Sequence, residues 1–118
     1  MNKNIQKYKQ IQNQSLTGKD LNIKVFSSLK GWITDTYNHN LIFTQRMNAL
    51  NNCISLATTL LQNLNNDIPE EEREKITMIL NLIIKKCSET VTILDKIDKK
   101  HFKNEIDSLD VVIELIKK

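Results

Sequence analysis

The stretch FTQRMNALNNCISLATTLLQNL, residues 43–64, decides the fold. Its apolar residues recur at alternating intervals of four and three, which places them on one side of an α-helix. They are Phe43, Met47, Leu50, Ile54, Ala57, Leu61 and Leu64. This spacing is typical of a helix that packs against others along a seam. We therefore predict an amphipathic helix that begins near residue 43 and ends at Asn65 and Asn66.

Three further segments carry the same helical period. A helix is predicted from Thr17, whose hydroxyl forms a variant of the capping box with the Asp20 carboxylate, to the polar cluster at 37–40. A third helix is predicted to begin around Pro69 and the three glutamates that follow it, and to run to Ile97. The fourth covers residues 102–116. Two glycines and one proline in 118 residues are too few for the many tight turns of an all-β fold.

Short connections between four helices make consecutive helices neighbours in space. The predicted fold class is therefore all-α, an antiparallel up-down four-helix bundle formed by residues 17–118. Residues 1–16 are polar with a few apolar residues at helical spacing, and are expected to form a short N-terminal arm or extra helical turn. The length of 118 residues fits a single core.

Composition and charge restrict the class of protein. The chain carries 17 basic and 14 acidic side chains, and residues 1–66 contain seven of the basic ones but only two of the acidic ones. This basic first half leaves open a bundle that binds nucleic acid, although it lacks arginine clusters and interleaved aromatic residues. No apolar run has the length of a signal peptide or of a membrane-spanning helix. We therefore expect a cytoplasmic protein without membrane insertion.

Residues that carry chemistry are scattered along the chain. Cys53 and Cys87 both fall within apolar helical patterns, which favours two reduced core thiols over a disulfide or a metal pair. The carboxylates fall at helix starts and on polar faces, and the sequence contains no glycine-rich phosphate loop and no metal-ligand spacing. We therefore expect no catalytic residue, no metal site and no cofactor, and predict that the protein is not an enzyme.

A second apolar stripe accompanies the seam of the 43–64 helix, displaced from it by about a third of a turn. It consists of Ile42, Ala49, Cys53, Leu56 and Leu60. The third predicted helix likewise has apolar residues on both flanks of its seam, Leu82 and Ile93 on one and Ile84 and Val91 on the other. Either these residues widen the core of the bundle, or they line a groove for an apolar helix of a partner. The two interpretations differ only in whether these apolar side chains are exposed to solvent.

The order and spacing of these features resemble the FliS family of flagellar secretion chaperones. Tyr8 is followed seven residues later by Ser15, where the family has a threonine, and Thr17–Leu21 stands at the capped start of the first helix. Val25 and Phe26 take the place of a Leu-Tyr pair. The segments that are similar to the family's second helix and closing helix are 48–65 and 106–116.

The resemblance implies a cytosolic helical bundle that binds the C-terminal segment of flagellin in apolar grooves, chiefly on its second and third helices. Such binding prevents premature polymerisation and delivers flagellin to the flagellar export gate for type III secretion. In the family the N-terminal arm covers part of the groove, and Tyr8 and Ile11 are the matching residues here. The expected client-binding residues are Ile42, Ala49, Cys53, Leu56, Leu60, Leu82 and Ile93.

Two alternatives from other classes remain open. A bundle that uses the basic first half to bind nucleic acid would lose affinity steeply with salt, whereas an apolar groove would respond weakly. A structural or adaptor bundle would instead use the second stripe for self-association. Concentration-dependent sedimentation without a client would favour this last alternative.

Overall fold

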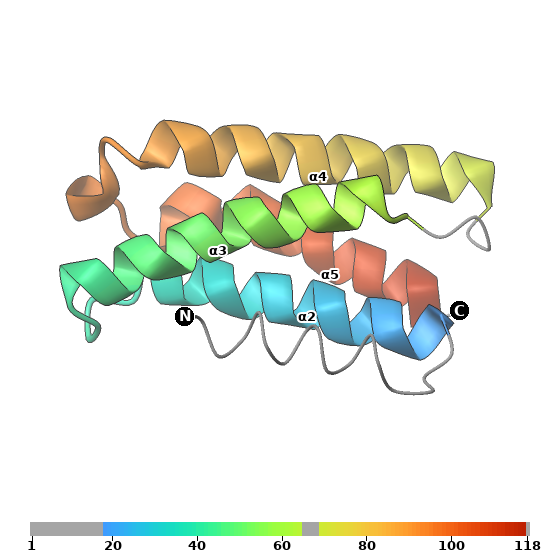
Figure 1. The fold of residues 1–118 in the computed structure, drawn as a ribbon, viewed down its shortest axis with the longest axis horizontal. Coiled ribbons are helices and arrows are strands. Elements are labelled where there is room, and N and C mark those ends of the chain that lie inside the picture. The colour runs from blue at the N-terminus through green and yellow to red at the C-terminus, as the bar shows by residue number, and fades with distance from the viewer. Residues whose placement is uncertain (1–17, 65–68, 118) are drawn as a thin grey trace.

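Four long helices and two short 3₁₀ helices make up most of the described chain (Figure 1). The computed structural model describes residues 18–64 and 69–117, with side chains from residue 22 onward. The elements are α2 (Gly18–Thr36), α3 (Phe43–Gln62), α4 (Glu70–Thr90), η1 (Leu94–Lys96), η2 (Lys99–Phe102) and α5 (Lys103–Lys117). The described residues contain no strand. The predicted all-α bundle of four helices is therefore confirmed, while the arm predicted for residues 1–16 lies outside the described residues.

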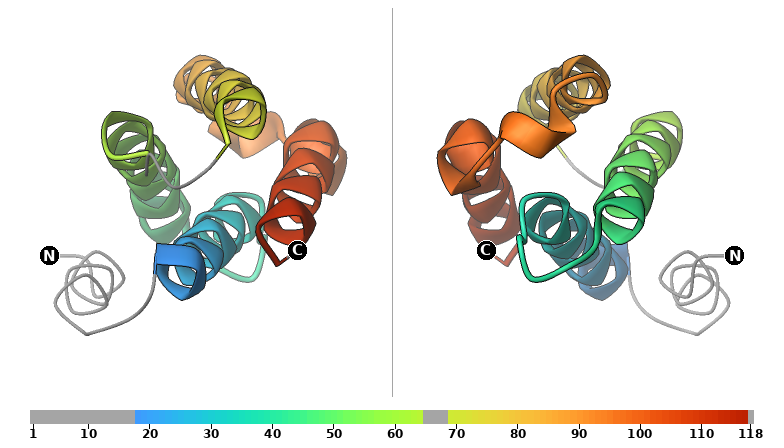
Figure 2. Two further views of the ribbon diagram at one scale, coloured as in Figure 1. Left: turned by 90° about the vertical axis from the view of Figure 1, so that its right-hand side faces the viewer. Right: turned by 90° about the vertical axis from the view of Figure 1, so that its left-hand side faces the viewer.

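The four long helices surround a shared core. α2 packs against α3 and α5, and α4 packs against the same two helices from the other side. In Figure 1 the chain runs from right to left along α2 and α4 and from left to right along α3 and α5, so consecutive helices point in opposite directions. Both end-on views in Figure 2 show the helices arranged as a ring. Each helix therefore has two neighbours and one face directed outward.

Every long helix contributes to one apolar cluster. The largest fully buried side chains are Val25, Phe26, Leu29, Ile33, Leu50, Ile76, Leu80, Ile83, Leu94, Phe102, Leu109 and Val112. Full burial of one such side chain contributes about 1.5–3 kcal/mol. This cluster is the main source of the stability of the bundle.

The end of α4 differs from the prediction. The helix ends at Thr90, well before the expected end at Ile97. Residues 90–93 are all β-branched, which lowers helix propensity, and the Ile93 backbone N–H donates to the Thr90 carbonyl in a turn at 3.0 Å. Leu94 and Ile97 are nevertheless buried. The helical period continues past the end of the helix because these two side chains enter the core from η1 and the residues after it.

Arg46 connects three elements at this end of the bundle. Its side chain is buried, Nε donates to the carbonyl of Thr36 at 3.0 Å, and Nη2 donates to the carbonyl of Leu94 at 2.8 Å. Thr36 is the last residue of α2, a helix with no basic side chain in its own last turn. Arg46 therefore supplies from α3 the positive charge that the C-terminal end of a helix dipole favours.

Candidate functional site

Four of the predicted client-binding residues belong to the core. Ala49, Cys53, Leu56 and Leu60 are all buried, because α3 packs against both α2 and α4 and needs a wide apolar arc. The expectation that these four residues line an exposed groove is therefore wrong. Cys53 and Cys87 are both free and buried, in agreement with the prediction of two reduced core thiols.

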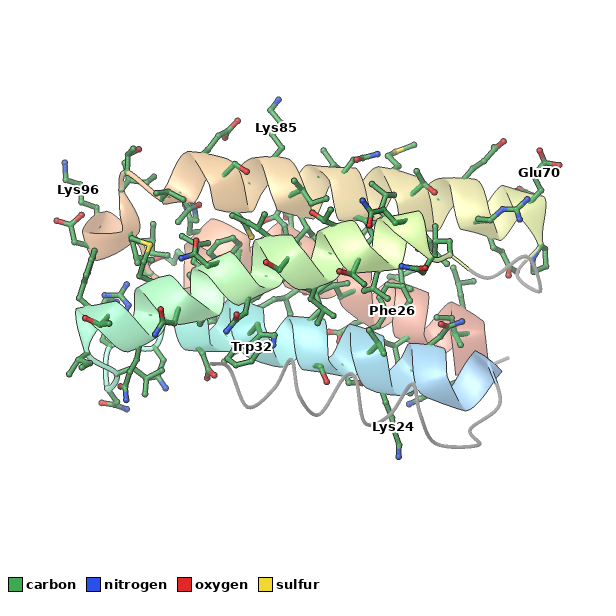
Figure 3. The ribbon with its side chains drawn as sticks, viewed as in Figure 1. Lys24, Phe26, Trp32, Glu70, Lys85 and Lys96 are labelled. Atoms are coloured by element: carbon green, nitrogen blue, oxygen red, sulfur yellow. The ribbon has the colours of Figure 1, made fainter. Side chains whose placement is uncertain are left out.

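The other predicted residues are exposed but do not form one surface. Leu82 is 53 % exposed and shares the outer face of α4 with Met78 and Lys85, at intervals of four and three. Lys85 points away from the bundle in Figure 3. Ile42 and Ile93, which are 66 % and 37 % exposed, lie at the end of the bundle where α3 begins and α4 has ended. Tyr8 and Ile11 lie outside the described residues.

A different row of apolar residues follows the boundary between α3 and α4. On α3, Met47, Ile54 and Leu61 recur every seven residues and share one flank. They are half-buried and pack against the edge of the core. On α4, Ile84 is half-buried, and Val91, seven residues later and directly after the end of the helix, is exposed. We name as the α3–α4 strip the residues Phe43, Met47, Ile54, Leu61, Ile84 and Val91.

The antiparallel register of the two helices brings the two halves of the strip together. Leu61 of α3 and Thr77 of α4 line the same surface hollow of about 360 Å³. Because the two helices run antiparallel, Ile54 and Met47, which lie seven and fourteen residues before Leu61, are placed toward the later part of α4, which carries Ile84 and is followed by Val91. Phe43 to Leu61 spans about 27 Å at 1.5 Å per residue. The strip therefore matches the length of a partner helix of about five turns.

Phe43 forms one end of the strip at the start of α3, and the apolar residue Ile42 precedes it. Ile42 is the N-cap residue, makes no side-chain capping bond and donates its backbone N–H to Gln45 Oε1 at 3.2 Å. Isoleucine is among the least favoured residues at an N-cap, where serine, threonine, aspartate or asparagine is worth about 1 kcal/mol more. Phe43, predicted to lie on the seam, is 52 % exposed. Helix stability does not explain these two apolar side chains at this end of the bundle.

The strip carries apolar contact surface and no acid, base or nucleophile. The groups with a shifted pKa lie elsewhere: burial raises the pKa of Asp35 near the end of α2, and burial lowers the pKa of His101 in η2. Burial and the neighbouring Cys87 thiol raise the pKa of the Cys53 thiol in the core. Within the described part of the chain, no group of three or more His, Cys, Asp and Glu side chains is placed to hold a metal ion.

Comparison with protein-family models, curated proteins and solved structures finds no match to this chain. None of the helices in the described residues combines the length and the apolar character needed to cross a membrane.

Proposed function

We propose that the protein is a helical-bundle chaperone that binds an apolar helical segment of a client along the α3–α4 strip. The observation that carries this proposal is the strip itself, an apolar surface along two neighbouring helices at the edge of the core. A helix that lies in a groove is recognised through side chains at intervals of three, four and seven residues. The strip presents its own residues at matching intervals.

The client is the C-terminal segment of flagellin, and this part of the proposal rests on the resemblance to the FliS family. Two features of the described residues support it: the chain folds as a helical bundle, and the α3–α4 strip follows its second and third long helices, α3 and α4. Binding in the cytoplasm would cover the segment through which flagellin polymerises and present the complex to the flagellar export gate. The chaperone contributes apolar burial and needs no catalytic residue.

The proposal includes a competitor from the same chain. Residues 1–16 carry Tyr8 and Ile11, whose apolar side chains would cover part of the binding surface while no client is bound. An exposed apolar surface promotes aggregation, so a reversible cover is useful for a chaperone. The client then displaces the arm as one apolar ligand displaces another.

Calorimetric titration with the C-terminal segment of flagellin from the same genome tests the proposal. We expect one-to-one binding that changes little between low and moderate salt, because apolar burial dominates the contact. Absence of binding heat, together with an unshifted band in native electrophoresis, would refute the flagellin assignment. Binding of nucleic acid that falls steeply with salt, or concentration-dependent sedimentation of the protein alone, would favour the two alternative classes instead.

A further inference from the structure

A second surface lies on the opposite side of the ring of helices, where α2 ends and α5 begins. It is a hollow of about 540 Å³ lined by Tyr37, Lys99, Lys100, Lys103, Ile106 and Asp107. Figure 2 (right) looks toward this end of the bundle. Tyr37 and Ile106 are half-buried and pack against the core. They form an apolar floor, and the three exposed lysines form a rim around it.

The rim has more positive than negative charge. Lys103 pairs with Asp107, Nζ to Oδ2 at 3.0 Å. Among the described residues, no carboxylate lies within ion-pair distance of Lys99 or Lys100. Within the part of the chain that the structure describes, two ammonium groups beside an apolar floor are therefore left without an ion-pair partner.

The i,i+4 pair with Asp107 accounts for Lys103 as a helix-stabilising residue, but no ion pair within the described residues accounts for Lys99 or Lys100. The positive end of a helix dipole favours carboxylates, and α4 begins accordingly with Glu70, Glu71 and Glu72. The first turn of α5 contains one acidic residue, Glu105, and three lysines gather beside it, two in η2 and one at Lys103. Their charge is better matched by negative groups that come from outside the bundle.

We infer that this hollow binds an acidic peptide segment of a partner protein that carries an aromatic or aliphatic anchor. The anchor lies on Tyr37 and Ile106, and its flanking carboxylates pair with Lys99, Lys100 and Lys103. The chain's own residues 1–16 are a poor occupant because they contain three lysines and no acidic residue. The site is separate from the α3–α4 strip and does not rest on the function proposed for the strip.

Fluorescence anisotropy with two labelled peptides tests the inference on the full chain. The probe is Glu-Glu-Leu-Glu-Glu-Phe-Glu-Glu, and the reference peptide has glutamine in place of every glutamate. We expect the acidic peptide to bind and the glutamine peptide not to bind. The double variant Lys99→Glu/Lys100→Glu should weaken binding by about tenfold or more, since it reverses both unpartnered charges. Tyr37→Ala should weaken it as well, because the anchor loses its floor.

The matched control is Lys24→Glu/Lys85→Glu, which changes the net charge equally at two lysines that point away from the bundle (Figure 3). This control should stay within about twofold of the wild type once salt screens long-range attraction. An equal loss of affinity for the acidic peptide in both double variants would show that net charge alone causes the loss, and would overturn the inference. No binding by the wild type, or equal binding of both peptides, would overturn it too. A wild-type dimer that Lys99→Glu/Lys100→Glu dissociates would assign the hollow to a second copy and would also overturn it.

Discussion

Replacing Phe43 by aspartate tests the α3–α4 strip at its one aromatic side chain. Phe43 is 52 % exposed, so of a phenylalanine surface of about 200 Å² roughly 100 Å² is left for a client to cover. At about 25 cal/mol per Å² this area corresponds to about 2.5 kcal/mol of binding free energy. Phe43→Asp should therefore weaken client binding by about 60-fold or more, since the new carboxylate must also be desolvated.

The assay is calorimetric titration of the variant with the flagellin segment, after circular dichroism has verified its helical content. A carboxylate in the first turn of α3 interacts favourably with the helix dipole, which offsets part of the lost packing. Met78→Asp is the matched control, because Met78 is 63 % exposed on the outer face of α4, away from the strip. Unchanged affinity of a folded Phe43→Asp variant would refute the strip as the binding surface. Equal losses in both variants would do the same.

Three further predictions concern stability and reactivity. Asn52 is only 7 % exposed, and its Nδ2 has no hydrogen-bond partner among the described residues. Because an unpaired buried amide costs about 1–3 kcal/mol, Asn52→Leu should raise the urea midpoint of unfolding at an unchanged m value. A lower midpoint would contradict this prediction. Burial, reinforced by Lys86, lowers the pKa of His101 from 6.5, so the unfolded chain binds a proton first on acidification. The free energy of unfolding, measured by urea titration, should then fall as the pH drops from about 6.5 toward the lower folded-state pKa. His101→Gln should remove this pH dependence. The same pH dependence in the variant would exclude His101 as its source. Burial and the neighbouring Cys87 thiol raise the pKa of Cys53. Iodoacetamide at mildly alkaline pH should therefore alkylate this thiol only after unfolding, as followed by mass spectrometry. Equally fast alkylation of native and urea-unfolded protein would contradict this, because it would show that the thiol is accessible.

Helix positions were more predictable than helix ends. The apolar residues of 43–64 give the helical period directly, and α3 spans Phe43–Gln62, close to the predicted range. The end of α4 was not predictable in this way. Leu94 and Ile97 keep the period and are buried, yet they reach the core after a turn. Apolar spacing reports which side chains are buried and does not distinguish a helix from a turn that buries the same residues.

The exposed surface was the least predictable part. Leu56 and Ile84 both lie off the seam of their helices, and the first is buried while the second is half-buried. Which flank is covered depends on the side on which each neighbouring helix docks, and the period of one helix does not encode that. Phe43 differs for another reason, since it fits the seam but stands at the first position of α3, where the bundle ends. The α4 flank of Ile84 and Val91 was visible in the sequence, but its partner residues Met47, Ile54 and Leu61 were assigned to the seam of the 43–64 helix, and the structure leaves them half-buried.

Arg46 also bears on the order in which the chain folds. Its bond to Thr36 spans ten residues of sequence, whereas its bond to Leu94 spans 48. Longer loops cost more entropy to close, so the second bond is expected to form late, after α3 and α4 have paired. Interactions that are absent from the folding transition state alter the unfolding rate and leave the folding rate nearly unchanged. The bond from Arg46 to Leu94 should therefore affect how long the native bundle persists more than how quickly it forms.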